Sequence, residues 1–298
     1  MGSSVSVGRS RPRIWTLVPK SRGIPSASLC FVASFSVLSA MGWPLPGEAQ
    51  DHEAHRALEA LSYPVDPSSS PRPVAWATRT DNSITLDGRL DEPAWDTAEP
   101  LTNFVQKQPH LGELATEQTI VRILFDDEYL YIAVSCLDTQ PDKIVVTSLE
   151  RDFGGNSPRN FDVVSITLDP FLDRRNAMLL HVNPAGAVRD AQVTGDGRIQ
   201  NVAWRGVWFA EAMVTDSGWV AEIAIPWTTL RFDPTRDEQV WGLNIQRRVR
   251  WKNEESVWSP LERHEPSHRM SRAGTLMGLK DVSGGRHLVV NPDPAWAR

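Results

Sequence analysis

The chain has 298 residues, of which 41% are hydrophobic and 23% charged, and its formal net charge is −6. Residues 1–50 carry a net charge of +4, so the remainder carries −10. An acidic body argues against a nucleic-acid partner, because phosphate binding needs a basic face, and it suits a neutral ligand or a cation.

Residues 1–50 have the pattern of an export signal with a long basic front. An apolar run at 29–41, rich in Ser and Ala, is shorter than the roughly 20 residues that a membrane span requires. Cleavage after Ala40 and cleavage after Ala49 both fit, and a basic leader on a cytosolic protein is the alternative. Cys30 would leave with the signal, so Cys136 has no partner and we expect no internal disulfide. The charges of the basic front are Arg9, Arg11, Arg13, Lys20 and Arg22.

Residues 51–73 are predicted to be a spacer. A short helix at 51–61 is followed by a stretch rich in Pro and Ser at 62–73. From residue 74 the pattern changes to short alternating runs, so we place the start of the folded domain there.

The chain from 74 to 282 is predicted to be a single antiparallel β-sandwich, an all-β fold. Apolar and polar residues alternate in short segments separated by turn residues, and no segment after residue 62 shows helical periodicity over eleven or more residues. Ten or more short strands in one domain indicate a sandwich rather than a parallel α/β sheet. A helical turn is expected at 93–99, and strands at 118–125, 129–136, 162–168, 177–182, 207–214, 219–225, 241–249 and 274–279.

The segment 216–232 combines a buried strand with one charge. Trp219, Ala221, Ile223 and Ile225 point to one side, and Glu222 points to the other. Proline 226 ends the strand, and one helical turn is expected at 227–230.

A charge on this strand needs a partner if it is covered. Arg247 and Arg248 are the candidates, because an arginine can bind a carboxylate through two hydrogen bonds. We therefore predict a structural ion pair of Glu222 with one of them, which fixes strand register.

Oxygen-bearing side chains at turns and strand ends suggest a structural calcium site, since Ca²⁺ prefers several oxygen ligands. No EF-hand loop is present, and an ordinary solvated turn is the alternative for each residue. The candidate ligands are Asp126, Asp138, Asn160 and Asp162.

Catalysis by a carboxylate pair is a weaker alternative. A glycosidase needs two carboxylates about 5–10 Å apart, and Glu222 beside Asp162 or Asp169 would be such a pair.

Five motifs in order resemble the family 9 carbohydrate-binding modules, over about residues 74–282. They lie at 84–95 (ITLDGRLDEPAW), 121–138, 162–170 (DVVSITLDP), 218–232 and 241–245 (WGLNI). The resemblance implies a β-sandwich without catalytic activity that binds sugar between aromatic side chains, together with structural calcium.

The resemblance implies one tryptophan three residues before Asp162 and a second near Ser267 or His268. Arg159 occupies the first position, and neither residue at the second is a tryptophan. The candidate sugar-binding residues are therefore Arg159, the nearby Phe161, Trp204 and Trp208, with a core position as the alternative for Trp208.

A narrower resemblance involves Asn183-Pro184-Ala185-Gly186, Arg189-Asp190 and Gly285-Arg286. It implies an exported front domain, in the periplasm or at the outer membrane, ahead of a β-barrel. Residues 283–298 would be a truncated linker or the start of that barrel. Three functions stay open: sugar binding linked to polysaccharide breakdown, a structural or interaction front domain that has lost sugar binding, and glycoside hydrolysis.

Overall fold

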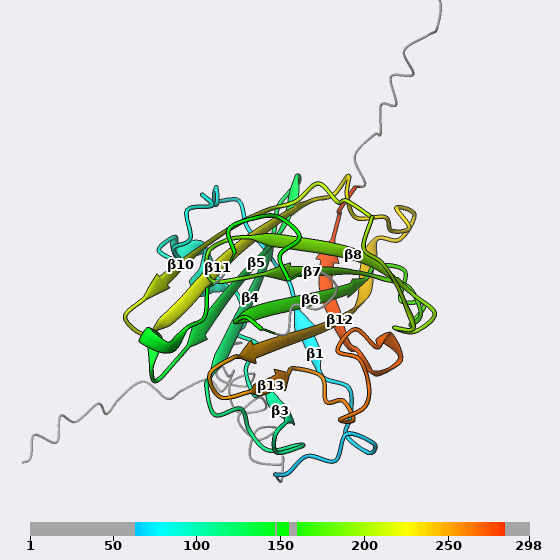
Figure 1. Cartoon of the computed structure of the whole chain (residues 1–298). Helices are drawn as coiled ribbons and strands as arrows, with labels where there is room; N and C mark the ends of the chain where they lie inside the picture. The colour runs from blue at the N-terminus through cyan, green and yellow to red at the C-terminus, as the bar shows by residue number, and fades with distance from the viewer. Residues whose placement is uncertain (1–62, 147, 155–159, 284–298) are drawn as a thin grey trace, which may run out of the picture. The chain divides into compact units, whose positions relative to one another are not determined.

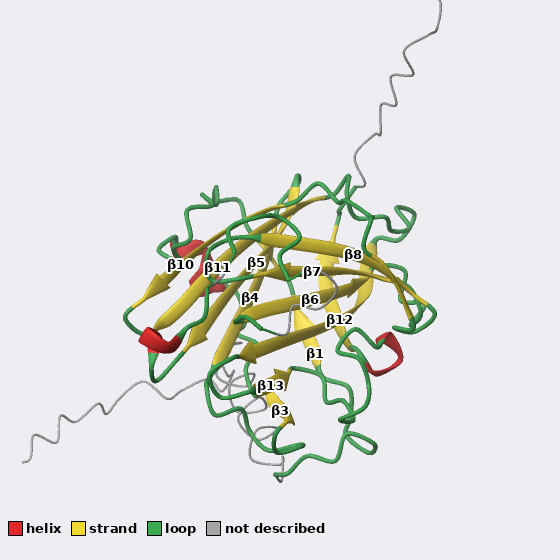
Figure 2. Ribbon diagram, viewed as in Figure 1, coloured by secondary structure: helices red, strands yellow, loops and turns green. Residues whose placement is uncertain are grey.

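The computed structural model describes residues 63–146, 148–154 and 160–283. Strands dominate this part of the chain, with only three short 3₁₀ helices (Figure 2). None of its helices is long and apolar enough to span a membrane. The predicted export segment, residues 51–62 of the spacer and residues 284–298 lie outside the described residues.

The described residues form fourteen strands and the three 3₁₀ helices η1 (Pro93–Thr97), η2 (Pro141–Lys143) and η3 (Met270–Arg272). The helical turn predicted at 93–99 is η1. The strands are β1 (Val74–Trp76), β2 (Thr78–Arg79), β3 (Val105–Gln108), β4 (Thr119–Phe125), β5 (Tyr129–Leu137), β6 (Val163–Asp169), β7 (Ala177–Val182), β8 (Val188–Thr194), β9 (Ile199–Asn201), β10 (Phe209–Thr215), β11 (Gly218–Pro226), β12 (Glu238–Val249), β13 (Glu254–Val257) and β14 (Gly274–Lys280).

Two sheets pack face to face, which confirms the predicted β-sandwich (Figure 1). The nine-stranded sheet has the order β1-β14-β12-β6-β7-β8-β9, with β13 paired to β12 and β3 paired to β13. The five-stranded sheet has the order β10-β11-β5-β4-β2. Two edge pairs, β1–β14 and β2–β4, are parallel, whereas the prediction was wholly antiparallel. These pairs join distant parts of the chain, so no hairpin imposes the antiparallel direction.

The core lies between the sheets and follows the alternation of the strands. In β11 the side chains of Trp219, Ala221, Ile223 and Ile225 are buried in it, as predicted. Residues 227–230 form a turn instead of the predicted helical turn, closed by a 2.9 Å hydrogen bond from the Thr229 amide to the Pro226 carbonyl. The Trp227 ring lies 6.1 Å from that of Trp241 on β12, so this turn contributes to the core.

The end of the predicted spacer is packed against the domain. Val65 is buried and contacts the apolar cluster of Val105, Val257 and Leu261. Its amide donates to the Gly112 carbonyl at 2.7 Å. The Arg272 guanidinium also donates to the Pro67 carbonyl at 3.2 Å, and the Arg72 guanidinium to the Ser271 carbonyl at 2.8 Å. The packed part of the chain therefore begins before residue 74, because an apolar anchor and these hydrogen bonds hold the end of the spacer.

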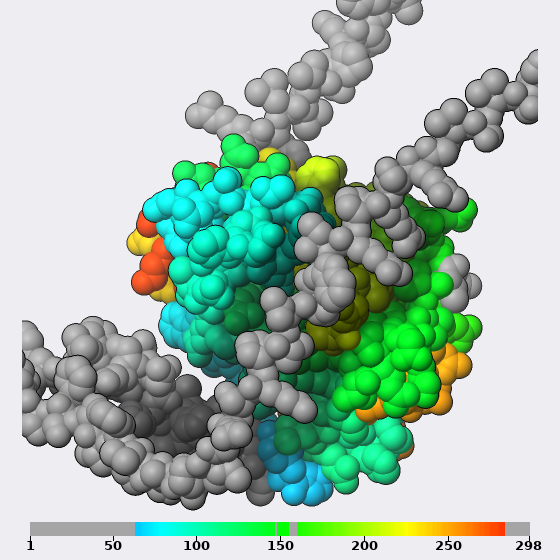
Figure 3. Space-filling view, turned by 90° about the vertical axis from the view of Figure 1, so that its left-hand side faces the viewer, coloured from blue at the N-terminus to red at the C-terminus, as the bar shows by residue number. Residues whose placement is uncertain are grey.

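A covering segment, residues 84–99, lies on the outer face of the five-stranded sheet. Its Trp95 and Ala98 pack with Leu124, Tyr131 and Ala224 in a second apolar cluster. Figure 3 shows this part of the chain, in cyan, on the surface of that side of the molecule. The side chain of Glu222 is on the same face, beneath the segment.

Glu222 holds the covering segment through backbone amides. The side chain is fully buried, and its Oε2 accepts hydrogen bonds from the amides of Asp87 at 3.0 Å and Gly88 at 2.9 Å. Its Oε1 is buried without a hydrogen-bond partner among the described residues. Gly88 has φ of 81°, and a Cβ there would lie 3.1 Å from the Ala212 carbonyl carbon, so this close turn requires glycine.

The predicted ion pair of Glu222 with Arg247 or Arg248 is wrong. Both arginines belong to β12 in the nine-stranded sheet, whereas the neighbours of β11 are β10 and β5. Arg248 pairs instead with Glu255 on β13, at 2.5 Å.

Arg247 points into the sandwich and reaches the other sheet. Its Nη1 donates to the Gln118 carbonyl at 2.9 Å, and its Nη2 lies 3.7 Å from Oδ2 of Asp138. Both charged side chains are 0% exposed. A buried arginine thus connects β12 to the start of β4 and the end of β5.

We expect Glu222→Ala to lower the free energy of unfolding by about 2–4 kcal/mol, because two amides lose a charged acceptor. Glu222→Gln keeps an oxygen acceptor and should stay within about 1 kcal/mol of wild type. Denaturant unfolding measures the stability of both variants. Glu211→Ala is the control, since Glu211 is exposed and lies on β10 directly opposite Glu222 of β11. Equal stability of Glu222→Ala and wild type would contradict the assigned role.

Burial raises the pKa of Glu222 above its ordinary value of 4.5; the two amide hydrogen bonds oppose this shift, and the nearby charges of Glu92 and Asp87 add to it. The folded state therefore keeps this proton to higher pH than the unfolded state does. The contribution of Glu222 to the free energy of unfolding falls as pH rises from the ordinary pKa through the raised one. Unfolding curves measured over this pH range should show that the free energy of unfolding of the Glu222→Gln variant lacks this pH-dependent decrease. An unchanged pH profile would mean that the carboxyl titrates normally.

Arg247→Met should destabilise the domain by about 3–5 kcal/mol, because it leaves the Asp138 carboxylate buried without its cation. Thermal melting compares it with Arg236→Met, which removes an arginine that is 51% exposed and should leave the Tm unchanged. A wild-type Tm for Arg247→Met would show that the bridge between the sheets adds nothing to stability.

Candidate functional site

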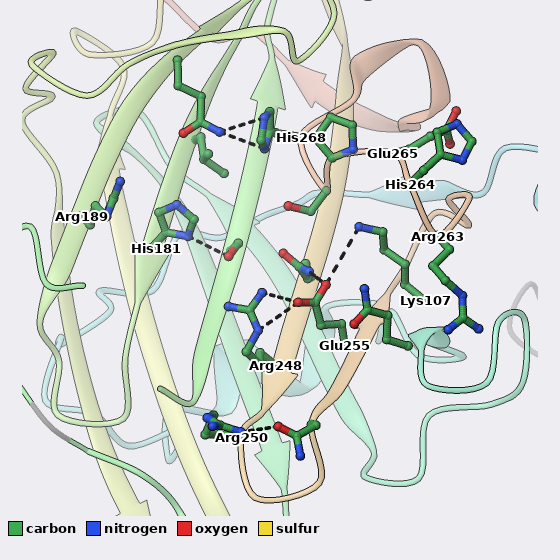
Figure 4. Close-up of a pocket in the computed structure, with 18 residues that line it drawn as sticks. Lys107, His181, Arg189, Arg248, Arg250, Glu255, Arg263, His264, Glu265 and His268 are labelled. Atoms are coloured by element: carbon green, nitrogen blue, oxygen red, sulfur yellow. Dashed lines mark hydrogen bonds and ion pairs between the residues drawn. The ribbon is translucent and has the colours of Figure 1, made fainter. Parts of the chain in front are cut away.

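A polar cavity of about 610 Å³ lies over the outer face of the nine-stranded sheet. Its walls come from β3, β6, β7, β8, β9, β12 and β13, and from the loop at 263–268 (Figure 4). The register places its floor residues side by side: Gln246 pairs with Ser165, Ser165 with His181, and His181 with Arg189. These are the outward-facing positions of strands whose alternate residues fill the core.

Positive charge exceeds negative charge in this polar cavity. Five cationic side chains and two carboxylates line it. The cations are Lys107, Arg189, Arg248, Arg250 and Arg263, and the carboxylates are Glu255 and Glu265.

Both carboxylates are already engaged by the protein. Glu255 lies between Arg248 and Lys107, as Figure 4 shows, with nitrogen–oxygen distances of 2.5 and 4.0 Å. Glu265 is 3% exposed and pairs with Arg269 at 2.9 Å and Arg272 at 3.5 Å. Both carboxylates are therefore held by cationic side chains of the protein itself.

Two histidines of the cavity, His181 and His268, are hydrogen-bonding groups whose pKa values are lowered by burial. His181 is buried, and its Nδ1 lies 2.7 Å from the Ser165 hydroxyl. Burial, and secondarily the charge of Arg189, lowers the pKa of His181 to about 3. Burial also lowers the pKa of His268, which lies 3.1 Å from the Gly197 carbonyl and 2.9 Å from the Gln200 amide.

Two positions that the sequence linked to sugar binding line the polar cavity. They are Ser267 and His268, where the resemblance implied a tryptophan. Phe161 is half-buried and packs against Phe153 at 5.8 Å instead, and Arg159 lies outside the described residues. Among the described residues, no Trp, Tyr or Phe ring lines this cavity.

A second, more apolar depression of about 440 Å³ contains Trp204, and we call it the Trp204 cleft. Phe171, Met178 and Val207 line it with Trp204. The Trp204 ring packs on Gly206, where an added Cβ would lie 2.7 Å from the ring. Trp208 is 4% exposed and donates from Nε1 to Asp190 at 3.0 Å. It therefore lies in the core, which was the alternative to a sugar-binding role for this residue.

The predicted calcium ligands do not come together in one cluster. Asp126 caps its own turn, accepting from the amides of Glu128 at 2.7 Å and Tyr129 at 2.8 Å. Asp138 pairs with Arg247, and Asn160 is exposed. Within the described ranges, no group of three or more His, Cys, Asp or Glu side chains could hold a metal ion. Structural calcium stays a prediction.

Asp162 and Asp169 are buried acceptors for backbone amides. Asp162 accepts from Val145 at 2.8 Å, and Asp169 from Arg174 at 2.7 Å. Burial raises the pKa of both. Glu222 belongs to the other sheet, so these residues do not form the carboxylate pair considered for hydrolysis.

Most residues that line the cavity were not predicted from the sequence. His181, Gln246, Glu255 and Lys107 were not singled out, and Arg189 was noted only within a motif. The available signal was polar residues at alternate positions of otherwise apolar strands, since those positions face away from the core.

Comparison with known proteins gives a family and a fold. The family model described as "Carbohydrate family 9 binding domain-like" matches residues 86–256. Endo-1,4-beta-xylanase A of Thermoanaerobacterium saccharolyticum is 23% identical over 158 residues. That match covers 52% of this chain but 12% of the xylanase, so the chain corresponds to a small part of that relative.

Solved structures share the fold at low sequence identity. A family 9 carbohydrate-binding module from Caldicellulosiruptor kristjanssonii, solved with glucose, superposes with a TM-score of 0.51 at 14% identity, covering 72% of this chain and 100% of that one. A protein from Bacteroides uniformis, proposed to bind carbohydrate, gives a TM-score of 0.56 at 12% identity, covering 70% and 100%. The family model spans more than half of the sequence, and the chain therefore belongs to the carbohydrate family 9 binding domain-like family.

Proposed function

We propose that the chain is a non-catalytic carbohydrate-binding module and that the polar cavity is its sugar site. Family membership supports carbohydrate binding. The position of Ser267 and His268 is the observation that supports placing the sugar site in the polar cavity. These residues stand where the resemblance implies a residue that flanks the sugar, and both line the polar cavity.

The size and chemistry of the polar cavity suit a saccharide. Its volume of about 610 Å³ lies within the range of roughly 300–1,000 Å³ that small-molecule sites occupy. Sugar hydroxyls both donate and accept hydrogen bonds, so they need amide and hydroxyl partners. Gln246, Gln200 and Ser165 supply such groups along the lining.

The module would hold a polysaccharide for a hydrolase rather than cut it. A relative named as a xylanase supports a link to polysaccharide breakdown, with hydrolysis assigned to an associated domain. We further propose export to the periplasm or outer membrane and a place ahead of an outer-membrane barrel. These two proposals rest on residues 1–50 and on the narrower resemblance described above.

The competing function is a structural or interaction front domain that has lost sugar binding. The lack of an aromatic ring among the described lining residues of the polar cavity favours it, because stacking on such rings is a major part of sugar affinity. Measuring sugar binding by titration distinguishes the sugar-binding function from the front-domain function.

Isothermal titration with mono- and oligosaccharides, with calcium and with chelator, should detect binding by the wild-type chain. Gln200→Ala and His268→Ala each remove a polar group of the cavity, and each should weaken binding by about tenfold. Trp204→Ala serves as the matched variant at the Trp204 cleft and should bind normally.

A loss of binding confined to Trp204→Ala would move the sugar site to the Trp204 cleft. A wild-type chain that binds no saccharide in either buffer would support the front-domain function instead. Equal Tm values across the variants exclude unfolding as the cause of a loss.

A further inference from the structure

We infer that the Trp204 cleft binds a second ligand, an aromatic carboxylate, independently of the sugar site. This inference goes beyond the proposed function, because the ligand is not a sugar and the cleft is not the polar cavity. The ligand class has two parts, a flat apolar ring and an acidic group attached to it. Each part follows from a different feature of the cleft.

The loop that carries Trp204 is held by the protein, so this wall of the cleft exists before a ligand binds. The Arg205 guanidinium donates to the Trp204 carbonyl at 3.0 Å and pairs with Asp152 at 2.8 Å. The Gly206 amide donates to the buried carboxylate of Asp190 at 2.8 Å. A wall that is already ordered saves the entropy that a mobile loop would lose on binding.

A second wall of the cleft comes from the turn at 227–230 and from Arg231, which follows it. This wall is bonded to the first one, because the Thr229 hydroxyl donates to the Val207 carbonyl at 2.6 Å. Thr229 and Val207 both line the cleft. The protein itself therefore fixes how the two walls lie relative to each other.

The apolar part of the lining favours a flat ring. Phe171 and Val207 line the cleft although they are 52% and 63% exposed, and the buried side chains of Met178 and Val193 lie beside them. Exposed apolar side chains around one depression gain free energy when a ligand covers them. The half-buried Trp204 ring adds a surface on which a second aromatic ring can stack. The volume of about 440 Å³ is within the roughly 300–1,000 Å³ of small-molecule sites.

The charges of the lining favour an acidic group on that ring. Two arginines line the cleft, and no aspartate or glutamate does so among the described residues. Arg205 already pairs with Asp152, whereas the exposed Arg231 forms no hydrogen bond or ion pair with any described residue. A guanidinium offers a planar fork of N–H donors that fits the two oxygens of a carboxylate. Arg231 is therefore the group that would recognise the acid.

Isothermal titration of the full chain with three related compounds tests the ligand class. Cinnamate has both the ring and the carboxylate, cinnamyl alcohol has the ring without the charge, and propionate has the carboxylate without the ring. We expect cinnamate to bind at least about tenfold more tightly than either of the other two. Raising NaCl from about 0.05 M to about 0.5 M should reduce its advantage over cinnamyl alcohol, because salt screens charge interactions.

Two variants test the two parts of the site separately. Trp204→Ala should weaken the binding of both cinnamate and cinnamyl alcohol about tenfold. Arg231→Gln should weaken cinnamate binding about tenfold and leave cinnamyl alcohol binding nearly unchanged. Because Arg231 is exposed, this variant keeps the test valid even where Trp204→Ala fails to fold.

Arg236→Gln is the matched control for charge. Arg236 is 51% exposed, pairs with Asp233 and does not line the cleft, so this variant should bind cinnamate like wild type. His268→Ala is the control for position, because it changes the polar cavity and should also leave cinnamate binding unchanged. Equal Tm values for wild type, Arg231→Gln and the two controls show that the fold is intact.

Three results would overturn the inference. Cinnamate could fail to bind, or it could bind no more tightly than cinnamyl alcohol with Arg231→Gln changing nothing, so that the cleft does not recognise an acid. Loss of cinnamate binding in His268→Ala alone would place the acid in the polar cavity instead. Sugar binding is measured separately with saccharides, so failure of this inference and failure of the proposed function are distinguishable.

Discussion

The buried contact of Arg247 with the opposite sheet is the constraint on which the rest of the structure depends. A guanidinium inside a sandwich loses its hydration, so it must find fixed acceptors. Its Nη1 donates to the Gln118 carbonyl next to β4, and the Asp138 carboxylate next to β5 lies 3.7 Å from its Nη2 as a counter-ion. Because both groups flank strands of the five-stranded sheet, the contact sets how β12 lies over that sheet.

The position of Arg247 also decides which residues face the cavity. Side chains alternate along β12, so an inward Arg247 places Gln246 and Arg248 on the outer face. Both of these line the polar cavity. One short run of sequence thus supplies a structural cation to the core and two lining groups to the polar cavity, and the same register separates the two roles.

The two outer faces of the sandwich differ: one is covered by the chain itself and the other carries the polar cavity. The five-stranded sheet is covered by residues 84–99, which its buried Glu222 holds through the amides of Asp87 and Gly88. The nine-stranded sheet carries Ser165, His181 and Arg189 on its outer face, and there the cavity forms. A sheet face that is closed by its own chain leaves little room for a ligand, and the polar cavity proposed as the sugar site lies on the other side.

Local alternation predicted eight of the fourteen strands of the described residues, because alternation depends on neighbours in sequence, but it did not predict the short or more polar strands β1, β2, β3, β8, β9 and β13. The β7 strand and the buried face of β11 followed directly from it. The partner of Glu222 was not predictable in this way, since strand order decides what lies beside β11 and no local pattern encodes that order. The cavity was missed for the same reason: Lys107, Arg189 and Arg263 are remote in sequence and meet only after the sheet is assembled. Ser267 and His268 were reached through the family resemblance alone.

The parallel pairing of β1 with β14 has a mechanical consequence. The Thr275 amide donates to the Pro73 carbonyl and the Ala77 amide donates to the Met277 carbonyl, both at 2.9 Å, so the first and last strands are bonded along their length. Because these strands run in the same direction, tension applied between residues 63 and 283 pulls them past each other. The bonds of this pair then bear the load together in shear, instead of opening one after another. A module that tethers a surface to a polymer would transmit force along that pair of strands.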